Sequence, residues 1–292
     1  MKTTTGYTTT MLTLALLLTL GGCVKDELHD TPHPDTGSIA VTADWADRGE
    51  GVAIPAEWTV TMGGYTGTET GATHSPDCLF TPGIYTLAAC NTPENITISG
   101  TTATVVREAG SGAFISSAPG WLFTSVQEVA IEADTDCELT AVMQQQVREL
   151  TLVIEPTGDA AERVEAIVGT LSGAAGSLDF STGTHGTPSE VELHFTEITS
   201  GDDAGKWTAT VRLLGIAGDA QRLTATLTYT DGNPQPTSLN SDLTAALHGF
   251  NDGKTVPLTL GGTLAGTPGE AGFTGEITDW ETVDGGNVDA EL

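Results

Sequence analysis

The stretch that decides the fold of this chain is residues 222–229, which read Arg-Leu-Thr-Ala-Thr-Leu-Thr-Tyr. Its apolar residues, Leu223, Ala225, Leu227 and Tyr229, stand at every second position. Successive side chains of a β-strand point to opposite faces, so this alternation places one apolar face against a core and leaves a threonine-rich face in water. The stretch therefore predicts a half-buried β-strand.

Short stretches of the same kind, separated by Gly, Pro, Asn or Asp, run along the rest of the chain. They cover residues 38–45, 58–62, 84–90, 96–98, 102–106, 126–131, 137–143, 150–154, 164–168, 191–195, 207–214, 255–260 and 273–280. Residues 162–170 also fit a helix by composition, and we favour a strand there because Gly169 and Gly173 follow. Residues 78–80, joined to 84–90 through Thr81-Pro82-Gly83, predict a β-hairpin. No stretch exceeds about ten residues and no long amphipathic helix follows one, so we expect all-β, antiparallel sheets packed as sandwiches.

Two such sandwiches fit the length of the chain, which has 292 residues. A glutamine run at 144–146 separates two series of strands, and we place the boundary at Val147. The sequence predicts an N-terminal β-sandwich over residues 37–147 and a C-terminal β-sandwich over residues 148–292. Each half is long enough to build its own core.

The charge balance excludes several classes of protein. Asp and Glu number 39 against 10 Lys and Arg, which gives a formal charge of −29. Ten cations over this length cannot form the basic face that a nucleic-acid binder needs. They cannot form a polybasic membrane-binding surface either. The 50 threonines and 36 glycines argue against a helical bundle, because both residues are poor helix formers.

The N-terminal residues 1–22 are predicted to be a signal peptide. Lys2 precedes an apolar run from Met11 to Leu20, which is too short to span a bilayer. The run ends in Leu20-Gly21-Gly22-Cys23, which resembles a bacterial lipobox, whose cysteine thiol carries the lipid. Acyl chains such as palmitate on Cys23 would anchor the protein to a membrane permanently. The alternative is an ordinary secretory signal followed by a chance cysteine.

A polar tether is expected after the lipid-bearing residue, over residues 23–36. Its start, Lys25-Asp26-Glu27, resembles the surface-export signal of Bacteroidota lipoproteins. The resemblance implies an outer-membrane lipoprotein exposed at the cell surface. The alternative is a solvated acidic tether without an export signal.

Several stretches of the folded part resemble the fimbrillin superfamily of Bacteroidota, in particular the anchor and minor-subunit branch of type V pili. They are Gly37 to Trp45, the run Thr81 to Asn91, Gly169 to Ala175, Asp242 to Thr244 and Glu276 to Trp280. The resemblance implies two transthyretin-like, Greek-key sandwiches. It also implies a non-enzymatic role in a fimbria and in adhesion.

Shaft subunits of this family are cut after a basic residue, which releases the first strand, and a strand of the next subunit fills the groove. By strand addition the unpaired backbone groups of the groove gain partners. The first basic residue after the first expected strand is Arg48, and its alternative role is that of a loop arginine. Only a short acidic tail follows Trp280. An uncut loop arginine at position 48 and a tail too short and acidic to donate a strand both favour an anchor or accessory subunit. Its partners would be fimbrial subunits and the outer membrane.

The main alternative is a surface lipoprotein that binds a glycan or a host ligand. Trp121 follows a Pro-Gly turn and is the candidate exposed platform for such a ligand. An enzyme is not expected, because no nucleophile elbow and no phosphate-binding loop occur in the sequence. We predict no catalytic residues, no cofactor and no metal site, since Cys78, Cys90 and Cys137 match no zinc spacing. These three are either free thiols or include one disulfide.

Overall fold

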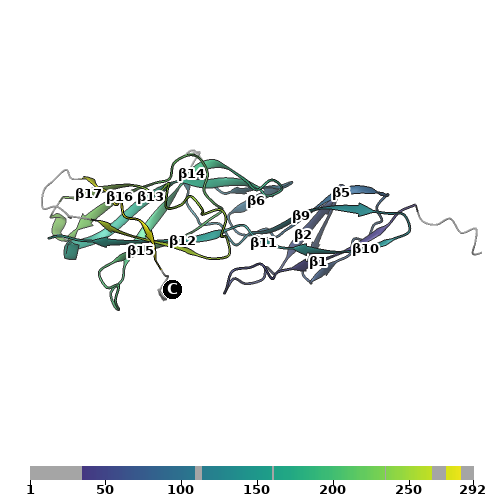
Figure 1. The fold of residues 1–292 in the computed structure, drawn as a ribbon, viewed down its shortest axis with the longest axis horizontal. Coiled ribbons are helices and arrows are strands. Elements are labelled where there is room, and N and C mark those ends of the chain that lie inside the picture. The colour runs from purple at the N-terminus through teal and green to yellow at the C-terminus, as the bar shows by residue number, and fades with distance from the viewer. Residues whose placement is uncertain (1–34, 109–113, 160, 234, 265–273, 284–292) are drawn as a thin grey trace, which may run out of the picture. The chain divides into compact units, whose positions relative to one another are not determined.

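The computed structural model describes residues 35–108, 114–159, 161–233, 235–264 and 274–283. Residues from Thr36 onward cluster as one compact unit. Figure 1 shows that the described elements are strands, apart from two 3₁₀ turns at Ala161–Arg163 and Thr230–Gly232. The prediction of an all-β protein is confirmed.

A first sandwich consists of two sheets. One sheet has the order β10-β1-β4 and the other the order β11-β9-β5-β2-β3. Apolar residues from both sheets, such as Val41, Trp58, Leu87 and Phe123, share one buried core. The bounds of these strands are β1 Ser38–Asp44, β2 Trp58–Met62, β3 Tyr65–Glu69, β4 Thr73–His74, β5 Gly83–Cys90, β9 Phe123–Ile131, β10 Asp136–Val142 and β11 Gln144–Gln145.

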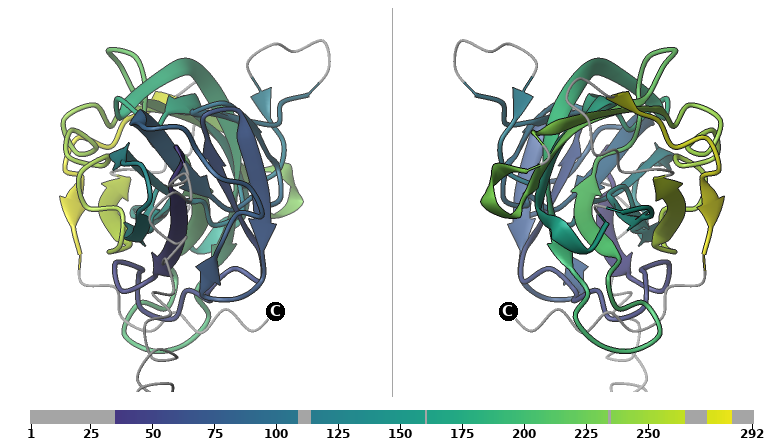
Figure 2. Two further views of the ribbon diagram at one scale, coloured as in Figure 1. Left: turned by 90° about the vertical axis from the view of Figure 1, so that its right-hand side faces the viewer. Right: turned by 90° about the vertical axis from the view of Figure 1, so that its left-hand side faces the viewer.

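A second sandwich is formed by a sheet of 12 described strands. Its main path runs β19-β17-β16-β13-β14-β15-β12-β18-β20. The two layers join where β14 pairs with β15 at Thr196 and Glu197. Figure 2 shows the strands from both ends of the molecule, and the buried side chains of the second sandwich form a larger core. The bounds are β12 Arg148–Pro156, β13 Val164–Asp179, β14 Thr184–Glu197, β15 Trp207–Leu213, β16 Arg222–Tyr229, β17 Thr237–Asp242, β18 Leu258–Leu264, β19 Thr274–Gly275 and β20 Glu281–Thr282.

Three strands that come before β9 in the chain belong to the sheet of the second sandwich. β6 (Ile96–Ser99) pairs with β7 (Thr102–Val105), and β7 pairs with β13. β8 (Phe114–Ile115) pairs with β14. The side chains of Ile96, Val105 and Ile115 accordingly lie in the second core. The division of the chain between residues 147 and 148 stays a prediction. Nothing in the sequence indicated that β6, β7 and β8 pair with strands of the second sandwich.

The predicted hairpin between residues 78–80 and 84–90 is wrong. Phe80 exchanges two backbone hydrogen bonds of 2.9 Å with Gly37, next to β1. β5 pairs instead with β9 over all eight of its residues and with β2 over four. These longer partners satisfy more backbone groups than three residues could. The Pro82-Gly83 turn therefore carries the chain from one sheet to the other.

The expected upper limit on strand length is also wrong, because β13 has 16 residues and β14 has 14. Gly169 and Gly173, which follow the predicted stretch 164–168, both lie inside β13. A Cβ on Gly169 would lie 2.9 Å from the Cβ of Ala225, so this glycine allows close approach of β16. Gly173, with φ +78°, sits at a bulge that lets the strand bend and continue.

The sheets are not purely antiparallel. β1 pairs with β10 in parallel over seven positions, and β12 pairs with β18 in parallel over seven positions. Two shorter parallel pairings join β8 to β14 and β17 to β19. The remaining pairings between the described strands are antiparallel.

Candidate functional site

The first strand, β1, is built into the middle of its sheet. Its alternating side chains Ile39, Val41 and Ala43 are buried in the first core, as the sequence pattern predicted. One edge of β1 pairs with β10 over the whole strand, and the other pairs with β4 at Val41 and Thr42. Removal of β1 would therefore expose core side chains and the backbone edge of β10.

The loop after β1 carries Arg48, the candidate cleavage residue. The Arg48 side chain is exposed, and its guanidinium donates hydrogen bonds to the carbonyl oxygens of Trp45 and Val52 at 2.9 and 3.2 Å. Gly49, the next residue, is buried, and its N–H donates to Oε1 of Gln145 at 2.8 Å. A Cβ at Gly49 would lie 2.7 Å from the carbonyl oxygen of Thr255. The peptide bond after Arg48 is thus packed against the chain.

Gln145 connects this loop to the second sandwich. Its amide nitrogen donates to the carbonyl oxygens of Val147 and Lys254, and the Lys254 ammonium donates to Oε1 of Gln146. Nearby, the Arg148 guanidinium donates to the carbonyl oxygens of Val256 and Phe250. Burial lowers the pKa of Arg148 and the pKa of Lys254, but backbone and amide oxygens hold both cations in place. The sequence did not reveal this junction, because an uncharged glutamine side chain gives no indication of its hydrogen-bond partners.

Trp121, the predicted ligand platform, is half-buried and packs against both cores. Its ring lines a pocket of about 210 Å³ with Lys254, Glu149 and residues 49–52. The Arg212 guanidinium lies over the ring, 5.5 Å from its centroid, so one face of the indole is engaged by a cation–π contact. The structure places Trp121 beside a small pocket but not on an open surface.

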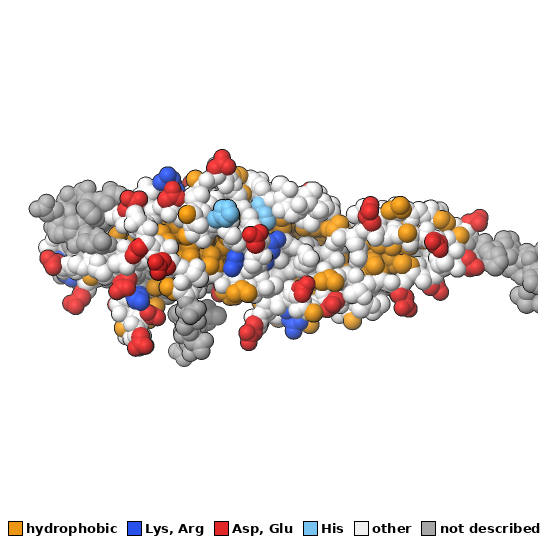
Figure 3. All heavy atoms as spheres, in the orientation of Figure 1, with side chains coloured by type: hydrophobic (Ala, Val, Ile, Leu, Met, Phe, Trp, Pro, Cys, Tyr) orange, Lys and Arg blue, Asp and Glu red, His pale blue; other side chains and the backbone are white. Residues whose placement is uncertain are grey.

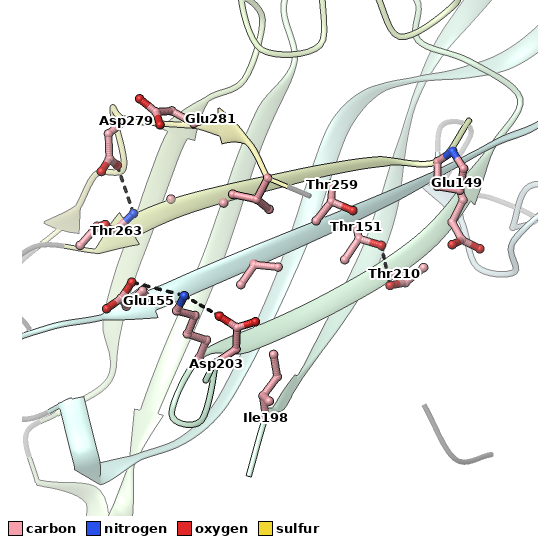
Figure 4. A pocket seen from close by; sticks show the side chains of 16 residues that line it. Glu149, Thr151, Glu155, Ile198, Asp203, Thr210, Thr259, Thr263, Asp279 and Glu281 are labelled. Atoms are coloured by element: carbon pink, nitrogen blue, oxygen red, sulfur yellow. Dashed lines mark hydrogen bonds and ion pairs between the residues drawn. The ribbon is translucent and has the colours of Figure 1, made fainter. Parts of the chain in front are cut away.

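A larger groove of about 590 Å³ lies on the outer face of the second sandwich. Its floor is formed by outward side chains of β12, β15 and β18, with Gly261 in the middle. One wall is the loop between β14 and β15, and the other is the C-terminal segment Asp279–Val283, as Figure 4 shows. The outward positions of β12 could be read from the sequence, but the two walls come from distant segments that only the fold brings together.

The groove carries a strong negative charge. Among its described lining residues there are five carboxylates and one ammonium, that of Lys206. The Lys206 ammonium lies 2.7 Å from Oδ1 of Asp203 and 3.9 Å from Oε2 of Glu155, so it is already engaged. Across the face drawn in Figure 3 acidic side chains outnumber basic ones, consistent with the composition of the chain.

The described cysteines are free thiols. Cys78 is exposed, and Cys90 and Cys137 are half-buried. Burial raises the pKa of Cys90 to about 11, so its thiol is protonated at neutral pH. Within the described ranges, His, Cys, Asp and Glu side chains do not gather in threes in a geometry that could hold a metal ion.

Four of the predicted site residues, Cys23, Lys25, Asp26 and Glu27, lie outside the described residues. The described part of the chain contains no helix that is long and apolar enough to cross a membrane. The structure brings Trp121 and the backbone that follows Arg48 to one pocket at the junction, since Gly49 also lines it.

Solved structures with the same fold cover most of the chain. The fimbrial anchor protein Mfa2 from Porphyromonas gingivalis superposes with a TM-score of 0.56 at 13% identity, over 85% of this chain and 97% of that one. A candidate adhesin from Bacteroides ovatus gives a TM-score of 0.55 at 18% identity, over 84% and 93%. A candidate polysaccharide binding protein from Bacteroides thetaiotaomicron gives 0.54 at 11% identity, over 85% and 98%. At these identities the likeness shows the fold alone.

No curated protein matches the chain. The family model of the fimbrillin-A associated anchor proteins Mfa1 and Mfa2 matches residues 60–285, which span both sandwiches. This confirms the resemblance seen in the sequence: the chain belongs to the family of fimbrillin-A associated anchor proteins Mfa1 and Mfa2.

Proposed function

We propose that this protein is a non-enzymatic, lipid-anchored subunit at the cell surface that attaches a fimbria to the outer membrane as its anchor or accessory subunit. The single observation that carries the proposal is the family match over residues 60–285. The lipobox at Cys23 and the export-like Lys25-Asp26-Glu27 support the membrane attachment. Fimbrial subunits are the partners, and strand addition at a sheet edge is the mode of contact.

The loop at Arg48 supports an anchor over a shaft subunit. A protease needs the residues on both sides of the scissile bond in an extended, accessible form. Here Gly49 is buried and hydrogen-bonded to Gln145, and Arg48 is bound to two carbonyl oxygens of its own loop. We therefore expect β1 to stay in place in the mature protein.

Mass spectrometry of the N-terminus of the protein purified from its own cells tests this directly. The proposal expects a chain that begins at acylated Cys23. A chain that begins at Gly49 would show that β1 is released, and would reassign the protein to the polymerising subunits.

A pair of variants tests the role in the fimbria. Cys23→Ala removes the acylated thiol, so fimbriae should be shed into the medium while the amount of shaft protein stays the same. Arg48→Ala is the matched control and should leave cell-attached fimbriae unchanged. If deletion of the whole protein leaves fimbriae attached and of normal length, the proposed function fails.

A second candidate function is binding of a glycan at the pocket beside Trp121. Two observations favour it: the pocket of about 210 Å³ that the indole lines, and the shared fold with a candidate polysaccharide binding protein. A glycan array probed with the wild-type chain and with Trp121→Ala tests it. Saturable binding that is lost in the variant supports this function, and an array without signal excludes it.

A further inference from the structure

The outer groove of the second sandwich runs along strand β12. Its floor consists of short side chains, with Thr151 and Val153 on β12, Thr210 on β15 and Thr259 on β18, together with Gly261. Thr151 and Thr210 hold each other by a hydroxyl hydrogen bond of 2.9 Å, so the floor is ordered. The groove follows β12 from Glu149 to Glu155. At about 3.3 Å per residue, that length matches about six residues of extended chain.

The negative charge of the groove favours a cationic ligand. Carboxylates stand at both ends, with Glu149 at one and Glu155, Asp203, Asp279 and Glu281 at the other, as Figure 4 shows. Lys206 is bound to Asp203 and Glu155, and Asp279 accepts a hydrogen bond from the backbone N–H of Thr263. Anionic ligands are repelled by a surface of this kind, and cationic ones are drawn to it.

Segments of this chain that the structure does not describe are poor candidates for the occupant. Residues 284–292 bear acidic but no basic side chains, and residues 24–34 hold one lysine against three acids. A second copy of the chain carries the same excess of acids. Repulsion therefore disfavours all three, and the occupant has to be another molecule.

The lining favours a peptide over a sugar. Among the described residues that line the groove none is aromatic, so these residues offer a sugar ring no aromatic face to stack on. Instead, Val153, Ile198, Pro257 and Val283 offer apolar spots between the carboxylates. Lysine and arginine suit such a surface, because their methylene stems pack on apolar atoms while their charged heads reach carboxylates.

We propose that this groove is a docking site for an extended, cationic segment of another protein. Its volume of about 590 Å³ lies within the usual range of binding pockets. The site is separate from β1 and its sheet, so it does not depend on strand addition. It does not depend on the lipid at Cys23 either.

Binding of a labelled peptide with four Lys-Thr repeats to residues 24–292, followed by fluorescence anisotropy, tests the proposal. The groove variant Glu155→Gln/Asp279→Asn/Glu281→Gln removes three charges and keeps the shape of the side chains. It should weaken binding about ten-fold, because three ion pairs of modest strength are lost. A peptide with four Glu-Thr repeats should not bind.

A matched control separates the groove from the general acidity of the protein. Glu128→Gln/Glu132→Gln/Glu138→Gln removes three exposed charges from the first sandwich. It should change binding less than two-fold, because these residues do not line the groove and salt screens exposed charges. Equal weakening in both triple variants would overturn the proposal, since net charge alone would then explain the binding.

A blocking variant makes the result independent of the acids. Thr259→Arg places a long cationic side chain at a half-buried position of the floor and should abolish binding of the lysine peptide while leaving the melting temperature unchanged. If maltohexaose binds to the wild-type chain and is lost in Thr259→Arg, while the lysine peptide does not bind, the groove is a glycan site and the proposal is wrong. If neither the lysine peptide nor maltohexaose binds to the wild-type chain, the proposal is also wrong.

Discussion

The two sandwiches of this protein differ in where their cores come from. The first depends on β1, a strand near the start of the chain that supplies Ile39, Val41 and Ala43 and is held by pairing with β10 and β4. The second is organised around the long internal pair β13 and β14, which no single cut near a terminus can remove. The first sandwich can therefore be disrupted by loss of one strand, β1, whereas the second keeps its central strand pair.

Removal of β1 should have the largest effect. A chain that begins at Gly49 loses the burial of Ile39 and Val41, worth about 1.5–3 kcal/mol each, and the seven-position ladder with β10. Hydrogen exchange followed by mass spectrometry should show β2, β5 and β9 losing protection while β13 and β16 keep theirs. A chain that begins at Thr36 is the control. Retained protection in the first sandwich would contradict the comparison.

A matched pair of cavity-creating substitutions should show whether the two cores unfold separately. Leu87 in the first core and Leu152 in the second are both fully buried, and truncating either to alanine should cost about 2–5 kcal/mol. Calorimetry should show Leu87→Ala lowering one thermal transition and Leu152→Ala another. A single transition that moves equally in both variants would show that the two sandwiches unfold together.

The junction should respond to a smaller change. Asn91 is buried; its amide donates to the carbonyl oxygen of Trp121 at 2.9 Å, and its Oδ1 accepts from the N–H of Phe123 at 2.7 Å. Asn91→Ala leaves both backbone groups without this partner, so it should cost about 1–3 kcal/mol. Urea unfolding measures the loss. The exposed Asn240→Ala serves as the reference and should change stability by less than about 0.5 kcal/mol.

The smallest effect is expected from the pH dependence of the second sandwich. Burial, and then the charge of Lys254, lower the pKa of His185 below its usual 6.5. The unfolded chain therefore binds a proton at higher pH than the folded chain, and stability falls as the pH drops from 6.5 through the folded pKa. Urea unfolding at pH 7 and pH 5 should show this loss. In His185→Gln the part of the loss due to this residue should disappear; an unchanged pH dependence would exclude His185 as its source.

Most strands could be predicted from the alternation of apolar and polar residues, since a strand with one face in a core must show it. β3 and β17 were missed because Tyr65–Glu69 and Thr237–Asp242 hold few apolar residues. The pairing of β7 with β13 could not be predicted either, because register and partner depend on contacts between distant segments. The same holds for the outer groove, whose floor is visible in the β12 pattern but whose walls are not.

Among the candidate site residues, Arg48 and Trp121 were chosen for their residue type in an expected loop. The structure shows both in contact with their surroundings, through the carbonyl oxygens around Arg48 and the guanidinium over Trp121. Sequence alone could not reveal this, because burial of Gly49 depends on Gln145 and Thr255, which lie about a hundred or more residues away in the chain. The lipobox cysteine and the export-like residues stay predictions.

The parallel pairing of β1 with β10 has a consequence for how the protein is made. Ser38 stands opposite Asp136, 98 residues later in the chain. β1, the first of the described strands, must therefore wait without this partner until nearly all of the first sandwich has been added. Contacts that span so much sequence form slowly, so the new chain has time to remain extended. The first sandwich can therefore close only after the chain has been made as far as β10.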